Sequence, residues 1–370
     1  MERVFVLCNG DHLTCTEQAA IFRFSGPRTV LSTGANGGGM RTDLTAAFNY
    51  CDCQTASVCQ PMEGNNLQDH QRAIARRLGL DPEHTTGLDT AANLDNMVVV
   101  TKRCEDFQIT AAVSAGADVN ALCAGDPAAL TETDGVPCPV PPGTINIFLV
   151  TDRPLSPGAM AELIMTAAEA KVAVLRDLMQ GSSISRNLAT GTGTDGMVII
   201  CPVGNAGTLL NAGKHFKFGE LTALAVREAL MEALFRQTGF CAQAQHSVLR
   251  RLRRFGITAA ALSAQCLDRS PDRHTAFSRT LEKLDRDAFL VGAVTLYVHL
   301  EDQCRAGMLT EMESVDWANH LLRQVQQHYH CDFPLIHGTG LMEKLGHFLC
   351  ELLLASLREQ ERLYPNQDPT

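Results

Sequence analysis

The stretch that decides the fold runs from Pro142 to Gly196. It opens P-G-T-I-N-I-F-L-V-T-D and closes A-T-G-T-G-T-D-G. Apolar side chains alternate with others over residues 145–149, which predicts a buried strand. A helical period then fills residues 158–180 and stops at Gly181. A polar turn ending at Asp195 leads into a short apolar run, so the stretch predicts a strand, a helix and a second strand.

One lysine interrupts the apolar stripe of this helix. Lys171 falls near the centre of the stripe, whereas Glu169 lies on the polar side of the helix. A buried ammonium group is costly unless it is paired or hydrogen-bonded. We therefore rank Lys171 first among the lysines as a functional residue. The alternatives are a side chain that extends to solvent and a structural ion pair.

Size and composition limit the classes of protein that fit. The chain has 370 residues, which is enough for one large domain and a smaller one. No apolar run approaches the roughly 20 residues that span a bilayer, and the run from Val4 to Cys8 is too short for a signal peptide. We expect a cytoplasmic protein without membrane insertion. The formal charge of −10 argues against nucleic acid as the main partner.

The fourteen cysteines are scattered rather than paired at regular spacings. Without a secretion signal, we expect them to be reduced thiols that pack as small apolar residues. The tightest group is Cys51, Cys53 and Cys59, with His70 further along. This spacing matches no established zinc motif, so we expect no metal site. Metal binding at this group remains an alternative.

A glycine run follows the strand predicted at residues 29–33. It reads G-A-N-G-G-G, from Gly34 to Gly39. Successive glycines let main-chain amides point into one concavity, which suits an anion or a developing oxyanion. The run lacks the ending of a Walker loop and the glycine order of a dinucleotide fingerprint. The alternative is a tight turn where two backbones approach closely.

Several further elements are predicted before the central stretch. A loop of small residues, from Ser114 to Asp126, follows the strand at residues 107–113. Loops of this kind commonly carry ligand contacts, although some serve only to connect elements. Residues 41–70 are rich in Asn, Cys and Gln, and we expect them to be irregular. Other strands are predicted at residues 3–8, 20–24 and 96–101, and a short helix at residues 68–78.

The character of the sequence changes near Gly239. A helix is predicted over residues 220–237, and almost every later segment has a helical period with little strand signal. We therefore predict an α/β fold (a mixed α+β sheet with packed helices) over residues 1–238. A smaller all-α domain of unassigned function follows over residues 239–370.

A series of motifs in residues 1–236 resembles the adenosylcobinamide amidohydrolases of corrinoid salvage. P-G-T-I-N and G-T-G-T-D around an A-E-A-K helix form a specific combination, whereas the glycine run alone is weak. The motifs span Leu31–Gly39, Ala111–Asp126, Pro142–Ile147, Thr166–Lys171, Ala189–Asp195 and Asn211–Leu221.

The resemblance implies hydrolysis of the amide that joins an aminopropanol arm to a corrin ring. The products would be adenosylcobyric acid and 1-amino-2-propanol. The cobalt-containing corrinoid is then the substrate, and the sequence indicates no required cofactor. Two alternatives are a corrinoid-binding or regulatory protein without catalysis, and a hydrolase of a different amide. The sequence also leaves open a homo-oligomer.

Amide hydrolysis needs a delivered nucleophile, donors for the tetrahedral oxyanion and a proton for the leaving amine. We predict Asp195 as the general base on water, although Asp also often caps a turn. The main-chain amides of Gly37, Gly38 and Gly39, with the Asn36 side chain, are predicted to form the oxyanion hole. Lys171 or His215 would protonate the amine or anchor an amide of the corrin ring. His215 could instead be a structural hydrogen-bonding residue.

Five hydroxyl and amide side chains complete the predicted site. Ser32, Thr192 and Thr194 are candidates for a covalent nucleophile, but none lies in a recognised nucleophile elbow. We therefore favour activated water. Ser114 and Asn146 are predicted to contact substrate, although Asn146 could instead satisfy a neighbouring loop.

Overall fold

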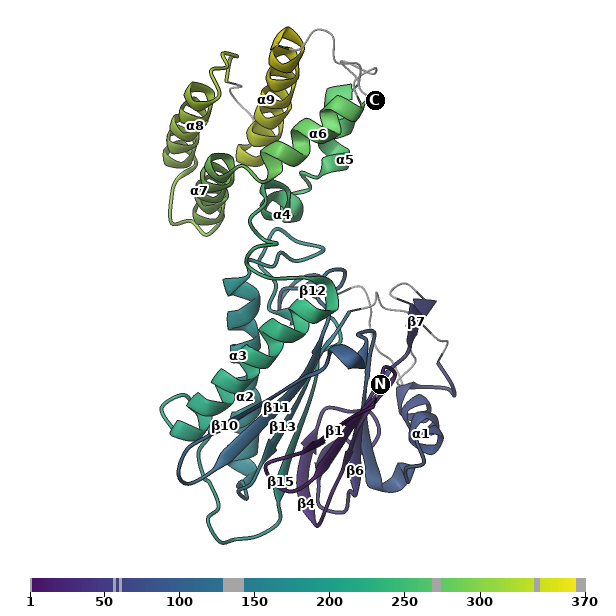
Figure 1. Cartoon of the computed structure of the whole chain (residues 1–370). Coiled ribbons are helices and arrows are strands. Elements are labelled where there is room, and N and C mark those ends of the chain that lie inside the picture. Colours follow the sequence, from purple (N-terminus) through teal and green to yellow (C-terminus); the bar gives the residue numbers. More distant parts are fainter. Residues whose placement is uncertain are drawn as a thin grey trace. The chain divides into compact units, whose positions relative to one another are not determined.

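The computed structural model describes residues 2–55, 58–59, 62–128, 143–267, 274–335 and 340–363. The chain divides into two compact units, Met1–Cys241 and Ala242–Thr370 (Figure 1). The first combines two main sheets with helices and the second contains helices, which confirms the predicted fold class. Pro142 lies outside the described residues.

A six-stranded sheet carries the stretch that was expected to decide the fold. The predicted strand–helix–strand unit is present as β13, α2 (Pro157–Asp177) and β15, and the two strands are parallel. The other neighbours in this sheet are antiparallel. The strand order is β10 (Val98–Arg103), β11 (Gln108–Ala115), β13 (Ile145–Thr151), β15 (Gly196–Pro202), β4 (Arg28–Ser32) and β5 (Gly39–Arg41).

A five-stranded sheet corrects the expectation that residues 41–70 are irregular. All six residues of β6 are buried, and β6 pairs in parallel with β9. Its sequence, A-A-F-N-Y-C, has no polar–apolar alternation because both faces are covered, so the pattern of a strand was missed. The strand order is β1 (Arg3–Val6), β2 (His12–Cys15), β3 (Ala19–Arg23), β6 (Ala46–Cys51) and β9 (Thr85–Thr90).

The 1–241 unit has four layers (Figure 1). Helices α2 and α3 (Lys217–Thr238) cover one face of the six-stranded sheet, and the five-stranded sheet packs on its other face. Helix α1 (Leu67–Arg77) covers the outer face of the five-stranded sheet. Side chains alternate across a strand, so Ile147 of β13 packs toward the helices while Phe148 stacks on Phe22 between the sheets.

Local sequence signals set the ends of the two long helices. The Ser156 hydroxyl accepts a hydrogen bond from the Ala159 main-chain N–H at 3.1 Å, and Pro157 occupies the first turn of α2. Helix α3 ends at Gly239, which has φ of 69°, a conformation that favours glycine. Ser156 and Pro157 therefore set the start of α2, and Gly239 sets the end of α3.

Short pairings complete the unit. Strand β12 (Ala121–Leu122) pairs with β14 (Gly191–Thr192), and β7 (Cys53–Thr55) pairs with β8 (Val58–Cys59). Cys53 is disulfide-bonded, which corrects for this residue the expectation that the cysteines are reduced thiols. Spacing in the sequence alone does not identify a disulfide at this cysteine.

The 242–370 unit has its own apolar core, to which residues between Val248 and Leu357 contribute. Helix α8 begins with a capping box between Thr310 and Glu313. No helix in the described part of the chain is long and apolar enough to cross a membrane. The helices are α4 (Val248–Leu252), α5 (Ala259–Leu267), α6 (His274–Asp285), α7 (Ala288–Arg305), α8 (Glu311–His328) and α9 (Leu341–Leu363).

Candidate functional site

Strand β9 runs across one end of the six-stranded sheet. Its Thr86 hydroxyl lies 2.7 Å from the Ser32 hydroxyl of β4. Three residues further along, its Asp89 carbonyl accepts a hydrogen bond from Asn146 Nδ2 of β13 at 2.9 Å. In the six-stranded sheet β15 lies between β4 and β13, so β9 contacts β4 first and β13 further along its length. This crossing gathers polar side chains from several predicted motifs at one end of the sheet.

Asn146 and Ser114 belong to one buried chain of hydrogen bonds between the sheets. Asn146 Nδ2 donates to Asn49 Oδ1 at 2.9 Å, and Asn49 Nδ2 donates to the Ser114 hydroxyl at 2.8 Å. The Asn146 Oδ1 atom is buried and has no hydrogen-bond partner among the described residues. The structure thus joins two predicted substrate contacts through Asn49, a residue that the sequence analysis did not single out.

Asp195 and Lys171 form an ion pair on the helix side of the same sheet. Their side chains are 16% and 14% exposed. Asp195 Oδ2 accepts hydrogen bonds from Lys171 Nζ and, at 3.1 Å, from the Thr192 main-chain N–H. Asp195 Oδ1 accepts from the Thr192 hydroxyl at 2.5 Å and from the Ile145 main-chain N–H at 3.0 Å. Four donors therefore hold Asp195 between the turn, β13 and α2. Thr194, on the same turn, is exposed and donates to the Gly143 carbonyl at 3.1 Å.

The glycine run lies on the other side of the six-stranded sheet, against β9. A Cβ atom added at Gly37 would lie 2.5 Å from the Thr85 carbonyl oxygen, and one added at Gly38 would overlap the Gly34 carbonyl. Gly39 pairs with Ser32 at the end of β4. The run is therefore a place where backbones approach closely. Helix α2, which carries Lys171, covers the opposite face of the sheet.

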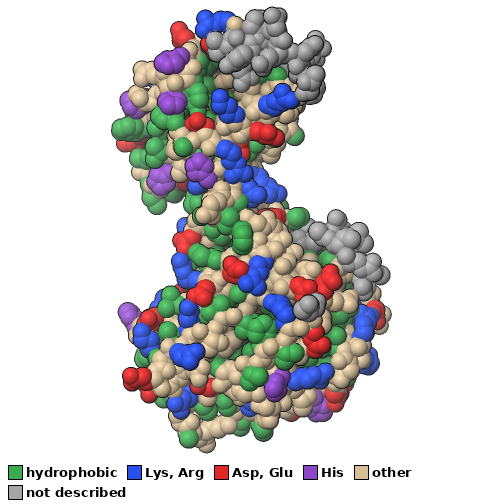
Figure 2. All heavy atoms as spheres, in the orientation of Figure 1, with side chains coloured by type: hydrophobic (Ala, Val, Ile, Leu, Met, Phe, Trp, Pro, Cys, Tyr) green, Lys and Arg blue, Asp and Glu red, His purple; other side chains and the backbone are tan. Residues whose placement is uncertain are grey.

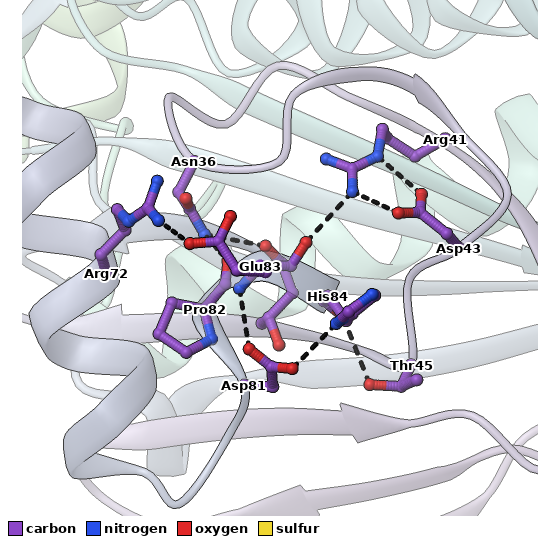
Figure 3. A network of polar contacts seen from close by, with 10 residues as sticks. Asn36, Arg41, Asp43, Thr45, Arg72, Asp81, Pro82, Glu83 and His84 are labelled. Carbon is purple, nitrogen blue, oxygen red and sulfur yellow. Dashed lines mark hydrogen bonds and ion pairs between the residues drawn. The ribbon is translucent and has the colours of Figure 1, made fainter.

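Asn36 fixes the glycine run to neighbouring segments (Figure 3). Its side-chain Nδ2 donates to the Pro82 carbonyl at 2.9 Å and to the Thr85 carbonyl at 2.8 Å. Its main-chain N–H donates to Gln71 Oε1 of α1 at 2.8 Å. Both hydrogens of the side-chain amide are thus used within the fold. An oxyanion role for this side chain requires one of the two bonds to break.

His215 lies at the opposite end of the sheet from Asp195. It is exposed and precedes α3, whose Phe218 ring lies 5.4 Å from the ring of Phe107, just before β11 begins. Asp195 instead bonds to Ile145, which pairs with the last residue of β11. The structure does not bring His215 together with the other predicted catalytic groups.

A cluster that the sequence did not predict lies under α1. Asp52, His70 and Asp89 each offer one ligand atom, and these atoms lie within 4.8 Å of one another. His70 Nε2 lies 3.1 Å from Asp52 Oδ1, and His70 Nδ1 accepts the Glu63 main-chain N–H at 3.0 Å. A main-chain N–H only donates, so in a neutral ring Nε2 carries the proton. The three residues come from separate elements, and no sequence spacing indicates their meeting.

Burial and charge set the protonation of this cluster. Burial raises the pKa of Asp89 to about 7, and the nearby negative charge of Asp52 adds to this effect. The hydrogen bond to Asp52 raises the pKa of His70. Carboxylate oxygens and imidazole nitrogens are also ligands for divalent cations. Because Nδ1 accepts the Glu63 N–H, a cation would bind first through the two carboxylates.

Charged side chains outside these clusters do not gather by sign on the face of the 1–241 unit that Figure 2 shows. Acidic and basic groups are mixed on that face (Figure 2). The features that distinguish the unit are therefore the buried polar groups where the two sheets cross.

Comparison with known proteins agrees with the motifs. The family model for adenosylcobinamide amidohydrolase matches residues 6–242. An uncharacterised protein of Methanocaldococcus jannaschii is 35% identical over 184 residues, which cover 47% of this chain and 71% of that protein. An adenosylcobinamide amidohydrolase of Halobacterium salinarum is 36% identical over 118 residues, covering 30% of this chain and 46% of that protein.

Two solved structures resemble the chain weakly. The PH0078 protein of Pyrococcus horikoshii has a TM-score of 0.31 and 11% identity, with 69% of this chain and 91% of that chain covered. A Burkholderia beta-aminopeptidase has a TM-score of 0.30 and 14% identity, with 66% and 88% covered. Likenesses at this level identify neither a common fold nor a common activity.

The α/β unit and its motifs define a hydrolase that acts on amide bonds. The chain belongs to the adenosylcobinamide amidohydrolase family, since the family model covers residues 6–242 of its 370 residues.

Proposed function

We propose that the chain cleaves the aminopropanol amide of adenosylcobinamide, giving adenosylcobyric acid and 1-amino-2-propanol for cobamide salvage. The match to the family model carries this proposal, because it spans nearly the whole 1–241 unit. Placement of the motifs adds support. Ser32, Ser114 and Asn146 come from three motifs and lie around the crossing of β9 over the six-stranded sheet.

Water is the proposed nucleophile. Asp195 remains our sequence-based candidate for the base, and water would then replace one of the donors around its carboxylate. The Ser32 hydroxyl, a covalent alternative, is shared with Thr86 and accepts from the Gly34 N–H at 3.0 Å. The partners described for the Ser32 hydroxyl include no carboxylate or imidazole that could take its proton. The Thr192 hydroxyl does donate to Asp195, at 2.5 Å, so Thr192 is the covalent alternative to activated water.

The setting of the reaction is also a proposal. We infer a cytoplasmic enzyme whose substrate supplies the only cobalt, with no further cofactor. The 242–370 unit has no assigned role in this reaction, and assembly into a homo-oligomer is left open.

Incubation with adenosylcobinamide tests the function. We expect release of 1-amino-2-propanol in step with adenosylcobyric acid, both followed by mass spectrometry, with and without a chelator. Boiled protein and cobinamide-free buffer are the controls. Tight corrinoid binding without release would make the chain a binding protein. If the protein hydrolyses a different amide and not adenosylcobinamide, the proposed substrate is wrong but the reaction class, amide hydrolysis, still holds.

A further inference from the structure

We propose that Cys266 of α5 and Cys350 of α9 form a disulfide bond that joins these two helices of the 242–370 unit. The inference assigns a site of covalent modification to the helical unit, and it does not depend on the proposed reaction. Three observations carry it: the distance between the two sulfur atoms, the packing of the two helices around them, and the oxidised state of another cysteine of the chain.

The first observation is the separation of the two sulfur atoms. Cys266 Sγ lies 2.6 Å from Cys350 Sγ. Carbon atoms that are not bonded approach each other to about 3.5–4.0 Å, and sulfur is larger than carbon. A disulfide bond is about 2.05 Å long. The two sulfurs therefore lie too close for two separate thiols, and a movement of about 0.5 Å closes the bond.

The second observation is that packing holds the two helices together beside the cysteines. Gln265, which precedes Cys266, has its Nε2 atom 2.7 Å from His347 Nδ1 of α9. Since His347 and Cys350 are three residues apart, they lie on the same side of α9. Cys266 is 1% exposed and Cys350 is 0% exposed, and both belong to the apolar core of the helical unit. The short contact thus follows from the way α5 packs on α9.

The third observation is that the chain contains an oxidised cysteine elsewhere. Cys53 of β7 is disulfide-bonded, so a disulfide is already part of this protein. In the described part of the helical unit, the other cysteines are Cys304 and Cys331, and neither has its sulfur in contact with another sulfur. The structure therefore offers one pairing in this unit, between Cys266 and Cys350.

Closure of the bond needs an oxidant, and we assign this role to a small-molecule disulfide such as oxidised glutathione. One cysteine thiolate attacks the oxidant, which forms a mixed disulfide and releases one small thiol. The second cysteine then attacks the sulfur of the first and releases another small thiol. The two protein thiols lose two electrons and two protons, which are recovered in the two small thiols. Because both sulfurs are buried, the bond closes as the helices assemble and reacts slowly afterwards.

Peptide mapping tests the bond directly. The purified full chain is equilibrated with reduced and oxidised glutathione, and every remaining thiol is then alkylated in urea. Trypsin cleaves after lysine and arginine, so Cys266 falls in the peptide of residues 255–269 and Cys350 in that of residues 345–358, each with one cysteine. We expect mass spectrometry to find these two peptides as one linked species that separates on reduction. Recovery of both as alkylated or glutathione-bound peptides overturns the inference, as does linkage of either one to a different cysteine.

Thermal unfolding separates the bond from ordinary packing. A crosslink between distant residues limits the freedom of the unfolded chain. Without reductant, calorimetry of the full chain should therefore place the Tm of the helical unit roughly 5–15 °C lower in Cys350→Ala than in wild type. With reductant most of this difference should disappear, because neither protein then carries the bond, and the Cys53 disulfide is reduced equally in both.

Cys304→Ala is the matched control, since Cys304 is a partly buried cysteine of the same unit outside the pair. It removes a sulfur atom but no bond, so its difference in Tm from wild type should be the same with and without reductant. A Cys350→Ala difference that reductant leaves unchanged contradicts the proposal, because it would then reflect only the cavity left by the missing sulfur.

Discussion

The Asp195–Lys171 pair shows how one contact answers a question that the sequence left open. Lys171 was expected to lie on an apolar stripe, and the structure gives its ammonium a carboxylate partner at the start of β15. An ion pair of this kind ties the helix to the strand that follows it. Whether Asp195 also acts as a base stays a prediction, and variants can separate the two roles.

A double-mutant cycle tests this pair. Asp195→Ala leaves the Lys171 ammonium largely buried without a partner, so we expect a loss of roughly 2–3 kcal/mol in unfolding free energy. Adding Lys171→Met removes the stranded charge and should recover about 1–2 kcal/mol. Urea denaturation measures both. Near-normal amide hydrolysis by folded Asp195→Ala would exclude Asp195 as the base, whereas loss of hydrolysis in Asp195→Ala but not in Lys171→Met, with corrinoid binding retained, supports that role.

The Asp89 cluster predicts how stability depends on pH. The folded-state pKa of Asp89 is raised from 3.8 to about 7, so the folded chain binds the proton more tightly than the unfolded chain. Its stabilising effect is complete below pH 4 and is lost as the pH rises through about 7. The raised pKa of His70 acts in the same direction. The Tm of wild type should therefore fall from pH 5 to 8 more than that of Asp89→Asn, and parallel curves would contradict this.

At the scale of elements, the run after β4 requires glycine for two reasons. Main-chain segments approach each other closely at some of its positions, and others have a positive φ. Gly37 has φ of 63° and lies against β9, while Gly38 lies against the Gly34 carbonyl. Gly39 has φ of 79° but no atom within 4 Å of the position of an added Cβ. The three glycines therefore differ in what a side chain would meet.

Two alanine substitutions in this run should differ in cost. Gly39→Ala places a side chain in open space at positive φ, which costs about 1–2 kcal/mol. Gly38→Ala drives a methyl group into main-chain atoms and should cost clearly more, because the backbone must shift. Unfolding in urea ranks the two variants. Equal losses would show that conformation, rather than contact, sets the requirement for glycine.

At the scale of the whole molecule, each unit builds its own core. The described residues of the 1–241 unit form three apolar clusters, and the described helices of the 242–370 unit form a separate one. Each cluster draws its described members from one unit alone. Every predicted site residue, and the Asp52–His70–Asp89 cluster, belongs to the first unit.

This division predicts that residues 1–241 fold and act alone. A fragment ending at Cys241 should unfold cooperatively, and it should cleave adenosylcobinamide with a kcat within about threefold of the full chain. Circular dichroism and the aminopropanol assay measure these two properties. A folded but inactive fragment would assign the helical unit a direct part in the reaction.

The sequence alone predicted the fold class and the order of most elements, because periodicity and caps are local signals. Residues 158–180 and Ser156–Pro157 specify α2, and alternation over residues 145–149 specifies β13. Asn146 and Asp195 were predicted to lie in one site, whereas in the structure Asn146 faces the second sheet and Asp195 faces the helices. Strand β6 was missed because burial on both faces removes the alternation that marks a strand.

Only the tertiary structure decided which polar groups meet. Asp52, His70 and Asp89 follow or belong to three elements that are far apart in the chain, and their contact depends on α1 packing over the ends of β6 and β9. His215 and Asp195 were placed in one site by motif, yet they lie at opposite ends of a sheet. Periodicity reports which face of an element is buried, but the crossing of two sheets sets which buried groups come within bonding distance.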